Sequence, residues 1–521
     1  MKNTYFMKTL FTLILCGFFS MTYAGTIYLS STGVDTNDGL TASTAVKTFT
    51  KAHDLASSGD TVMVSGMIDF AADVTLAKDL IIMGTSNTMD GFDGKNSVQL
   101  IKTGGFNLNM SNLKLTGGLS AGNGGAMVIT GGTVTITKVI FEANAAAVRG
   151  GAISIEPATA LTLNFNRCVI KNNSSTTEAA AYYYTDSAGT ANTVTFTNCA
   201  IISNNATTTG AGGYVNNTSG SLQLSYINCT IAKNNSGGNS SAGLFVGNLQ
   251  ATSNLVLTNC TMTENTCQTA ATSGAGIRVA TAVNTNLGKV KLYNTIIENN
   301  YYPTTSTGTT TSGWTTDFVW QGDGFAAGTT LIIENSLIGR PMAASNVKWL
   351  VATNSFPTSK YNYVTAASGN CTDSYIAKFD TFNATTNSYA LLNDSFALSY
   401  GLTSWLGTGT VLDQLNFPRP TPNCSAGSVE KNPTGPALGV QKMDKKDSFV
   451  VFRNTSNQIV ISDASEDTES SISVYNSLGQ MVYKTPSAGV VTTIEKSFNA
   501  GLYLVSIQKG GATITKKVVL N

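Results

Sequence analysis

The sequence predicts an all-β protein: a right-handed parallel β-helix solenoid with an N-terminal cap helix, followed by a small C-terminal β-sandwich. Three observations predict it. A repeat of about 30 residues is typical of a solenoid. Its apolar spacing suits strands rather than helices, and short alternating segments after residue 447 indicate the sandwich. The repeat is marked by four cysteines at steps of 31, 30 and 31 residues, namely Cys168, Cys199, Cys229 and Cys260.

The apolar residues around each cysteine are spaced by two, three and two positions. The frame extends to eight copies, whose central residues are Leu113, Val139, the four cysteines, Thr295 and Ser336. Three residues earlier stand Met110, Ile136, Phe165, Phe196, Tyr226, Leu257, Leu292 and Ile333. A helix needs apolar residues three and four apart, whereas this spacing gives a strand, a corner and a second strand.

Two asparagine columns follow the same frame. The first, one residue before the centre, is Asn112, Asn198, Asn228, Asn259, Asn294 and Asn335, with Lys138 and Arg167 as departures. Asparagine tolerates the left-handed backbone that a corner needs. The second column, which we expect to close the second strand with a turn, is Asn144, Asn173, Asn204, Asn234, Asn265 and Asn300. Glycines lead into a third short strand, so we expect roughly three strands per coil, with coils about 4.8 Å apart.

Composition and the first residues indicate an exported protein. Only 12 % of the 521 residues are charged and the net charge is +1, which favours neither nucleic acid nor an anionic membrane as partner. Lys2 and Lys8 precede an apolar run at 10–19, and Thr22-Tyr23-Ala24 resembles a cleavage site. We therefore predict a signal peptide at 1–24 and a mature chain that does not span the membrane.

Seven cysteines remain after the signal peptide. The column of four is expected to be a buried stack of thiols. Disulfides between adjacent coils, and a bridge from Cys371 to Cys424, remain open alternatives in an oxidising compartment.

Residues 26–66 contain apolar residues at helical spacing, from Val46 to Ala56. We predict a short helix with Ser43 as N-cap and Gly59 as its stop, lying across the open end of the solenoid. His53, the only histidine, is interpreted as a solvated surface residue rather than a catalytic one. Asp35, Asn37 and Asp38 are interpreted as a turn rather than a calcium site. No metal or cofactor is predicted.

Two coils, carrying residues 178–186 and 301–324, read as longer than the rest, and insertions in solenoids leave as loops on one face. They concentrate aromatic residues beside Asp317 and Asp323, and these are Tyr182, Tyr183, Tyr184, Tyr301, Tyr302, Trp314 and Trp320. The rings form a tentative sugar-binding platform, or else pack the loops onto the coils.

The coil strands offer only scattered charged residues, namely Arg149, Glu156, Arg278, Lys289 and Lys291. A polysaccharide lyase needs a basic residue beside acids, and a glycosidase needs carboxylates facing one groove. No catalytic residue is predicted, and whether the chain is an enzyme stays open.

Three segments of the solenoid resemble known secreted proteins. Residues 26–66 (Y-L-S-S-T-G-V-D-T-N-D-G, a K-T helix and G-D-T-V-M-V-S-G) resemble the N-terminal cap of pectate-lyase-like β-helix proteins. Phe141-x-x-Asn144 and Gly150-Gly151-Ala152-Ile153 resemble the repeats of chlamydial polymorphic outer-membrane proteins, which are surface adhesins. Residues 413–430 resemble the closing motif of secreted β-helix proteins, with asparagine and serine replacing its usual glycine and alanine.

The C-terminal segment carries a further resemblance. The blocks SVYNSLGQMVYK (473–484), GLYLVSI (501–507) and KKVVLN (516–521) resemble the C-terminal sorting domain of cargo carried by the type IX secretion system of Bacteroidetes. That resemblance implies handling by the type IX machinery and a place outside the cell or on the outer-membrane surface.

These observations predict a signal peptide (1–24), a β-helix passenger (25–430), a linker (431–446) and a sorting β-sandwich (447–521). The first functional hypothesis is an adhesin or glycan-binding protein, with glycans or a host surface as partners. The alternative is a carbohydrate-active enzyme, a polysaccharide lyase or glycoside hydrolase on the same fold.

Overall fold

The computed structural model describes residues 24–238, 241–268, 275–280, 289–300, 317–320, 331–339 and 360–361, and parts of 377–430 and 449–520. The chain divides into two compact units, one of residues 1–415 and 419–434, the other of 435–521 with 416–418. The predicted signal peptide, apart from Ala24, and the predicted linker at 431–446 lie outside the described residues. No helix in the described part of the chain is long and apolar enough to cross a membrane.

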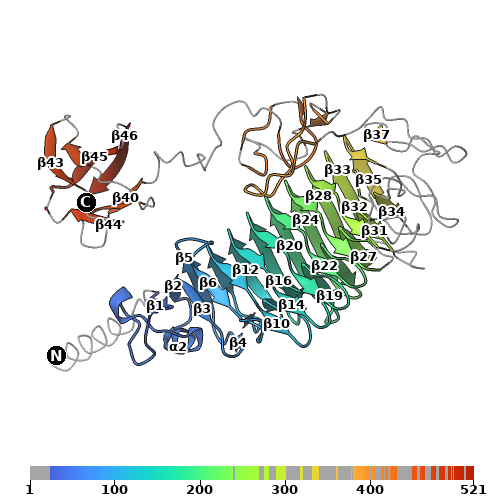
Figure 1. The fold of residues 1–521 in the computed structure, drawn as a ribbon, viewed down its shortest axis with the longest axis horizontal. Coiled ribbons are helices and arrows are strands. Elements are labelled where there is room, and N and C mark those ends of the chain that lie inside the picture. The colour runs from blue at the N-terminus through green and yellow to red at the C-terminus, as the bar shows by residue number, and fades with distance from the viewer. Residues whose placement is uncertain are drawn as a thin grey trace, which may run out of the picture. The chain divides into compact units, whose positions relative to one another are not determined.

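The first unit is a parallel β-solenoid, as predicted, in which each strand pairs with its counterparts on neighbouring coils (Figure 1). Sheet A comprises β1 (Thr26–Ser30), β2 (Thr61–Ser65), β5 (Leu80–Gly84), β8 (Leu108–Ser111), β12 (Gly132–Thr137), β16 (Leu161–Asn166), β20 (Ala191–Thr197), β24 (Ser221–Ile227), β28 (Asn254–Thr258), β32 (Lys289–Tyr293) and β35 (Leu331–Glu334). Sheet B comprises β3 (Met67–Asp69), β6 (Gly91–Asp93), β9 (Lys114–Thr116), β13 (Ile140–Glu142), β17 (Val169–Lys171), β21 (Ala200–Ile202), β25 (Thr230–Ala232), β29 (Thr261–Thr263), β33 (Ile296–Ile297), β36 (Leu337–Ile338) and β37 (Lys360–Tyr361).

Two further sheets complete the coils. Sheet C comprises β4 (Val74–Thr75), β7 (Ile101–Lys102), β11 (Met127–Ile129), β15 (Ile153–Ile155), β19 (Tyr182–Asp186), β23 (Tyr214–Asn217), β27 (Leu244–Asn248), β31 (Ile277–Val279) and β34 (Phe318–Trp320). Sheet D comprises β10 (Leu119–Ser120), β14 (Ala145–Ala146), β18 (Ser174–Ser175), β22 (Asn205–Ala206), β26 (Asn235–Ser236) and β30 (Thr266–Cys267). Sheet D was not expected, because strands of two residues leave no alternation to read. The right-handed sense of the coil stays a prediction.

Equivalent side chains lie above one another inside the solenoid. Phe196 stacks between Phe165 and Tyr226, with ring centroids 4.6 and 4.9 Å apart. The cysteine column forms a single file in which the backbone N–H of Cys168 donates to Sγ of Cys199 at 3.4 Å, and that of Cys199 to Sγ of Cys229 at 3.4 Å. The described cysteines are free thiols, and Cys371 lies outside the described residues. The predicted buried thiol stack is confirmed.

The first asparagine column bends the chain as predicted. All eight corner residues, Lys138 and Arg167 included, have φ between 47° and 55°. Only asparagine, aspartate and glycine visit this left-handed region without an appreciable steric cost. The column therefore records a backbone requirement of every corner.

The second asparagine column is not the turn that the sequence suggests. The left-handed residue is the one before it, as at Ser203 and Lys233. The asparagines instead form a buried ladder in which each Nδ2 donates to Oδ1 of the next residue at 2.8–3.0 Å, along Asn144, Asn173, Asn204, Asn234, Asn265 and Asn300. Asp317 ends the ladder by accepting from Nδ2 of Asn300 at 2.8 Å. The ladder satisfies polar groups that the coils bury.

The N-terminal helix is present with other bounds than predicted. A 3-10 turn η1 (Ala42–Thr44) precedes α2 (Phe49–Leu55), whose N-cap is Thr48 rather than Ser43 and whose C-cap is Ala56. Phe49 and Ala52 are buried, so the helix packs its apolar side inward.

The outer edge of β1 is covered by the segment before the helix. The backbone N–H of Tyr28 donates to O of Gly39 at 2.8 Å, and Val46 and Tyr28 are joined by an N–H to O bond of 2.9 Å. Pairing the free edge of a strand in this way prevents its association with other chains.

The described part of residues 377–430, drawn in orange-brown in Figure 1, covers the outer face of sheet B from β21 onward. Ala200, Ile202 and Ala232 point outward from this sheet and pack against Tyr389 and Phe382. The short strands β38 (Gly401–Leu402) and β39 (Asn423–Cys424) pair in the same segment. The contacts of this described part fall on sheet B and on corner residues such as Asn228 and Asn294, whereas Tyr214 and Phe245 of sheet C stay partly exposed.

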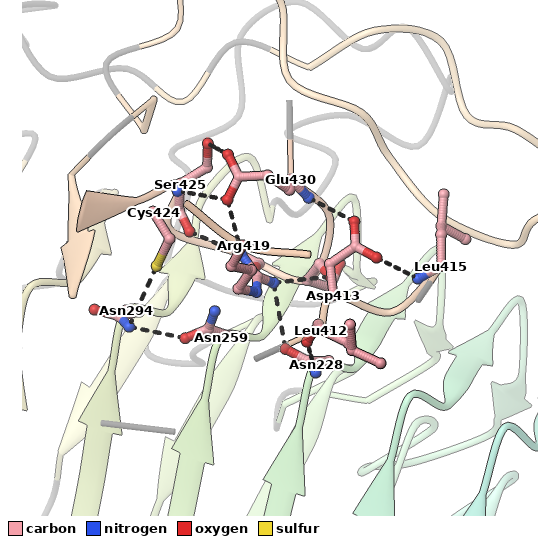
Figure 2. A network of polar contacts seen from close by, with 12 residues as sticks. Asn228, Asn259, Asn294, Leu412, Asp413, Leu415, Arg419, Cys424, Ser425 and Glu430 are labelled. Atoms are coloured by element: carbon pink, nitrogen blue, oxygen red, sulfur yellow. Dashed lines mark hydrogen bonds and ion pairs between the residues drawn. The ribbon is translucent and has the colours of Figure 1, made fainter. Parts of the chain in front are cut away.

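The last part of this covering segment, residues 412–430, is called the clasp. The clasp is attached to the coils through the buried Arg419 (Figure 2). Its guanidinium donates to the carbonyl of Gly427 at 2.8 Å and to Oδ1 of Asn228 at 3.3 Å, and lies 3.5 Å from Glu430. Asp413 accepts the backbone N–H of Glu430 at 2.9 Å. The charged residues of the predicted closing motif are thus brought together on the corner column.

The second unit contains two antiparallel sheets. One comprises β40 (Phe449–Arg453), β41 (Ile459–Asp463) and β44 (Val491–Ile494), and the other β43 (Met481–Pro486), β42 (Ser471–Asn476), β45 (Gly501–Lys509) and β46 (Ala512–Leu520). Their shared core includes Ile461, Ile472, Ile494, Val505 and Val518. Sequence analysis missed β44, whose threonines break the apolar alternation.

Candidate functional site

Sheet C carries a stripe of large outward side chains on successive coils. The strand register places Tyr183 opposite Tyr214, Tyr214 opposite Phe245, and Phe245 opposite Arg278. Neighbouring positions such as Tyr184 and Val246 point into the core and are at most 1 % exposed. Because alternate residues of a strand point to opposite faces, the stripe lies on the outside.

The rings of the stripe contact one another edge to face. The centroids of Tyr183 and Tyr214 lie 5.4 Å apart at an interplanar angle of 79°, and those of Tyr214 and Phe245 lie 4.8 Å apart at 66°. Such geometry is the favourable one for aromatic pairs. Tyr183 is 4 % exposed, whereas Tyr214 and Phe245 are partly exposed.

An arginine lies at each end of the stripe. The guanidinium of Arg149 lies 5.2 Å from the ring centroid of Tyr183, and that of Arg278 lies 5.7 Å from the ring of Phe245. Both distances are within the range of cation–π attraction. We call Arg149, Tyr183, Tyr214, Phe245 and Arg278 the aromatic–arginine stripe.

The charge of Arg149 is balanced within the stripe. Its Nε donates to Oε2 of Glu178 at 2.6 Å, and this hydrogen bond raises the pKa of the guanidinium. The two side chains remain 39 % and 24 % exposed. The ion pair is therefore accessible, and offers donors and acceptors side by side.

Burial sets the ionisation of the other stripe residues. It raises the pKa of Tyr214 to about 12, so its hydroxyl stays neutral at physiological pH. Burial also lowers the pKa of Arg278, although a guanidinium remains charged at neutral pH.

Amides and a second carboxylate flank the rings. Nδ2 of Asn216 donates to the hydroxyl of Tyr183 at 3.4 Å, and Nδ2 of Asn248 donates to Oδ1 of Asn216 at 2.6 Å. Glu156 accepts from Nδ2 of Asn123 at 2.8 Å. The face thus combines ring edges, amides and carboxylates. No group of three or more His, Cys, Asp or Glu suited to a metal occurs in the described segments.

The predicted platform residues fall in different places. Tyr182, Tyr183 and Tyr184 begin β19 and pair in register with β15, so residues 178–186 belong to an ordinary coil and are not an inserted loop. The rings of Tyr182 and Tyr184 are inside the core, 1 % exposed, where the hydroxyls of Tyr182 and Tyr226 bond to each other. Of the three, only Tyr183 belongs to the stripe. The prediction that this coil is longer than the others was wrong, because the step from Cys168 to Cys199 is 31 residues, like that from Cys229 to Cys260.

The structure does not describe the side chains of the other four platform residues. Tyr301, Tyr302 and Trp314 are outside the described residues, as is the side chain of Trp320, whose backbone pairs with Val279. They stay a prediction.

Tyr214 and Phe245 were missed by sequence reasoning. The signal was present: the residue before each inward-facing residue of the third strand is Ser154, Tyr183, Tyr214, Phe245 and Arg278 in turn. The solenoid pattern was defined by its inward apolar residues, and this column points outward.

His53 and the early acidic residues have structural partners. His53 is 8 % exposed rather than solvated, and its Nε2 accepts the backbone N–H of Ala77 at 3.2 Å. Asp35 accepts from the backbone of Lys47 and Thr48 at 2.8 and 2.9 Å, just before α2. These groups hold the helix in position.

Comparison with known proteins is informative for the C-terminal unit alone. No curated protein and no solved structure matches the chain. Residues 453–521 match the secretion system C-terminal sorting domain. The chain therefore ends in a type IX secretion sorting domain, and is a β-solenoid protein exported to the cell surface or beyond.

Proposed function

We propose that the solenoid is a glycan-binding protein, acting as an adhesin of the cell that exports it. The observation that carries the proposal is the aromatic–arginine stripe on a face that the described clasp and cover leave open. Aromatic rings contact the apolar C–H faces of sugars, while amides, guanidinium and carboxylate groups bond their hydroxyls.

The fold supports the same proposal. Tyr183, Tyr214, Phe245 and Arg278 lie on paired strands, and Arg149 bridges to Glu178 on the next coil, so their spacing is fixed before a ligand arrives. Pre-ordered groups lose less conformational entropy on binding, which favours affinity. Export through the sorting domain supports the proposal, because it would bring such a surface into contact with external glycans.

A glycan array probed with the purified full chain tests the proposal. We expect binding by the wild type and its loss in Tyr214→Ala. The matched control is Tyr293→Ala, which removes a partly exposed tyrosine from the outer face of sheet A. Equal binding by both variants would place the site elsewhere, and binding only to protein ligands would contradict the proposal.

A carbohydrate-active enzyme is the second candidate. It is favoured by one observation, the presence of Glu156 and Glu178 on the same face as the rings, since glycosidases use two carboxylates. Product analysis of each array ligand separates the two functions. Cleavage that is lost in Glu178→Gln would establish the enzyme, and binding without cleavage the adhesin.

A further inference from the structure

The strand β27, which carries Phe245 of the stripe, is irregular at one glycine. Val215 pairs with Val246, but the next residue, Asn216, pairs with Asn248, so Gly247 is an extra residue in β27. Such a β-bulge re-aims the neighbouring side chains and is frequent beside functional sites.

Gly247 makes room for the central ring of the stripe. A Cβ at this position would lie 2.8 Å from Cε2 and 2.9 Å from the hydroxyl oxygen of Tyr214. The ring of Tyr214 therefore lies against the bare backbone of Gly247. The same bulge brings the amide of Asn248 to that of Asn216, which in turn reaches the hydroxyl of Tyr183.

The guanidinium of Arg149, at one end of the stripe, already has a carboxylate partner. Arg149 lies over the ring of Tyr183 and pairs with Glu178 at 2.6 Å, whereas Arg278, at the other end of the stripe, lies against the ring of Phe245. A uronate or sulfate group would have to compete with Glu178 for the guanidinium of Arg149.

We propose that the stripe binds a neutral glycan, with Tyr214, seated by the bulge at Gly247, as its central contact. This inference rests on the proposed glycan-binding function and names the ligand class of that site. The ion pair and the paired amides present both donors and acceptors, which suits sugar hydroxyls, each of which both donates and accepts a hydrogen bond.

The test titrates the purified full chain with two sets of probes. Cello- and xylo-oligosaccharides are neutral, and oligogalacturonides and heparin fragments are anionic. We expect binding to a neutral probe, with an affinity that changes little between 50 and 500 mM NaCl, because screening affects charged partners.

Gly247→Ala separates the stripe from the rest of the molecule. The added methyl group meets the far end of the Tyr214 side chain, which moves without unfolding the coil, so binding should weaken at least about tenfold, equivalent to about 1.4 kcal/mol. The control is Gly122→Ala, whose Cβ would approach only Oγ of Ser120, at 3.9 Å. It should bind as the wild type does, and both variants should keep the wild-type unfolding midpoint within a few degrees.

Each outcome decides. Salt-dependent binding of the anionic probes in place of the neutral ones would overturn the neutral ligand class and leave the proposed function standing. Neutral binding that Gly247→Ala does not weaken would overturn the assignment to the stripe. Absence of binding to every glycan would defeat the proposed function itself.

Discussion

At the residue scale, the two asparagine columns have different roles: one adopts the left-handed backbone of the corners, and the other forms hydrogen bonds between coils. The corner asparagines are required by positive φ, and the second column by the burial of its amides. Both columns could be read from the sequence, but the role of the second could not. An asparagine repeated once per coil is expected both for a turn residue and for a buried ladder. Only the hydrogen bonds between neighbouring coils distinguish the two.

The buried ladder predicts a large effect for Asn204→Ala. Oδ1 of Asn204 accepts both the N–H and the Nδ2 of Asn173, at 3.0 and 2.9 Å. Removing the acceptor leaves buried donors unsatisfied, so unfolding free energy should fall by about 3 kcal/mol. Urea denaturation measures it. The adjacent Asn205→Ala, on an exposed side chain, should change it by less than about 0.5 kcal/mol. Similar losses in both would contradict the ladder.

The corner requirement predicts a stabilising substitution. Lys138 is exposed and has φ of 55°, where asparagine is favoured over lysine. Lys138→Asn should raise the melting temperature, by an amount corresponding to roughly 0.5 kcal/mol. Thr133→Asn, in an extended strand, should lower it instead. A lower melting temperature for Lys138→Asn would show that the lysine side chain matters more than its backbone.

His53 predicts a pH dependence. Burial lowers the pKa of His53 from its usual 6.5, so the unfolded chain takes up a proton more readily than the folded one. The contribution of the neutral imidazole is complete above the unfolded pKa and is lost as pH falls below it. We expect His53→Gln to reduce the drop in urea midpoint between pH 7.5 and pH 5. An unchanged drop would assign it to the carboxylates.

At the element scale, strands with regular alternation could be predicted and the short or outward features could not. Sheet D escaped because its strands have two residues, and β19 was misread as a loop because three consecutive tyrosines hide which ring points inward. The clasp was visible as a motif, but a sequence does not show which coils it contacts. Asn228 lies 191 residues before Arg419.

The clasp predicts that Arg419→Met destabilises the first unit. The substitution leaves the buried carboxylate of Glu430 without its cation, and the loss of one member of a buried ion pair typically lowers the unfolding free energy by about 3–5 kcal/mol. The double variant Arg419→Met, Glu430→Gln should recover part of this loss. Urea unfolding and limited proteolysis within 377–430 report it. The matched cation Lys171, which is 28 % exposed beside Glu142, should cost under about 1 kcal/mol on change to methionine. Equal losses of unfolding free energy in Arg419→Met and Lys171→Met would contradict the role assigned to Arg419.

At the scale of the whole molecule, the chain forms two compact units, a β-solenoid and a unit that contains the sorting domain. The sorting domain has its own hydrophobic core, separate from the core of the solenoid. Sequence alone predicted both units, because one shows a repeat and the other contains three blocks that resemble a known sorting domain. Of the face proposed to bind glycans, only Tyr183 was predicted, because the rest of the stripe depends on which strands of sheet C lie side by side.

The division predicts a specific result for a chain that ends at residue 434. Without the sorting domain it should remain inside the exporting cell, yet show the β-rich circular dichroism and cooperative unfolding of the first unit. Cell fractionation and circular dichroism measure the two properties. Normal export of this chain would contradict the role of residues 453–521.

The most direct measurement is a calorimetric titration of the best array glycan into the wild type, Tyr214→Ala and Tyr293→Ala. The stripe predicts at least about tenfold weaker binding for Tyr214→Ala and wild-type affinity for Tyr293→Ala. Wild-type affinity in Tyr214→Ala, with the fold intact, would contradict the assignment of ligand binding to sheet C.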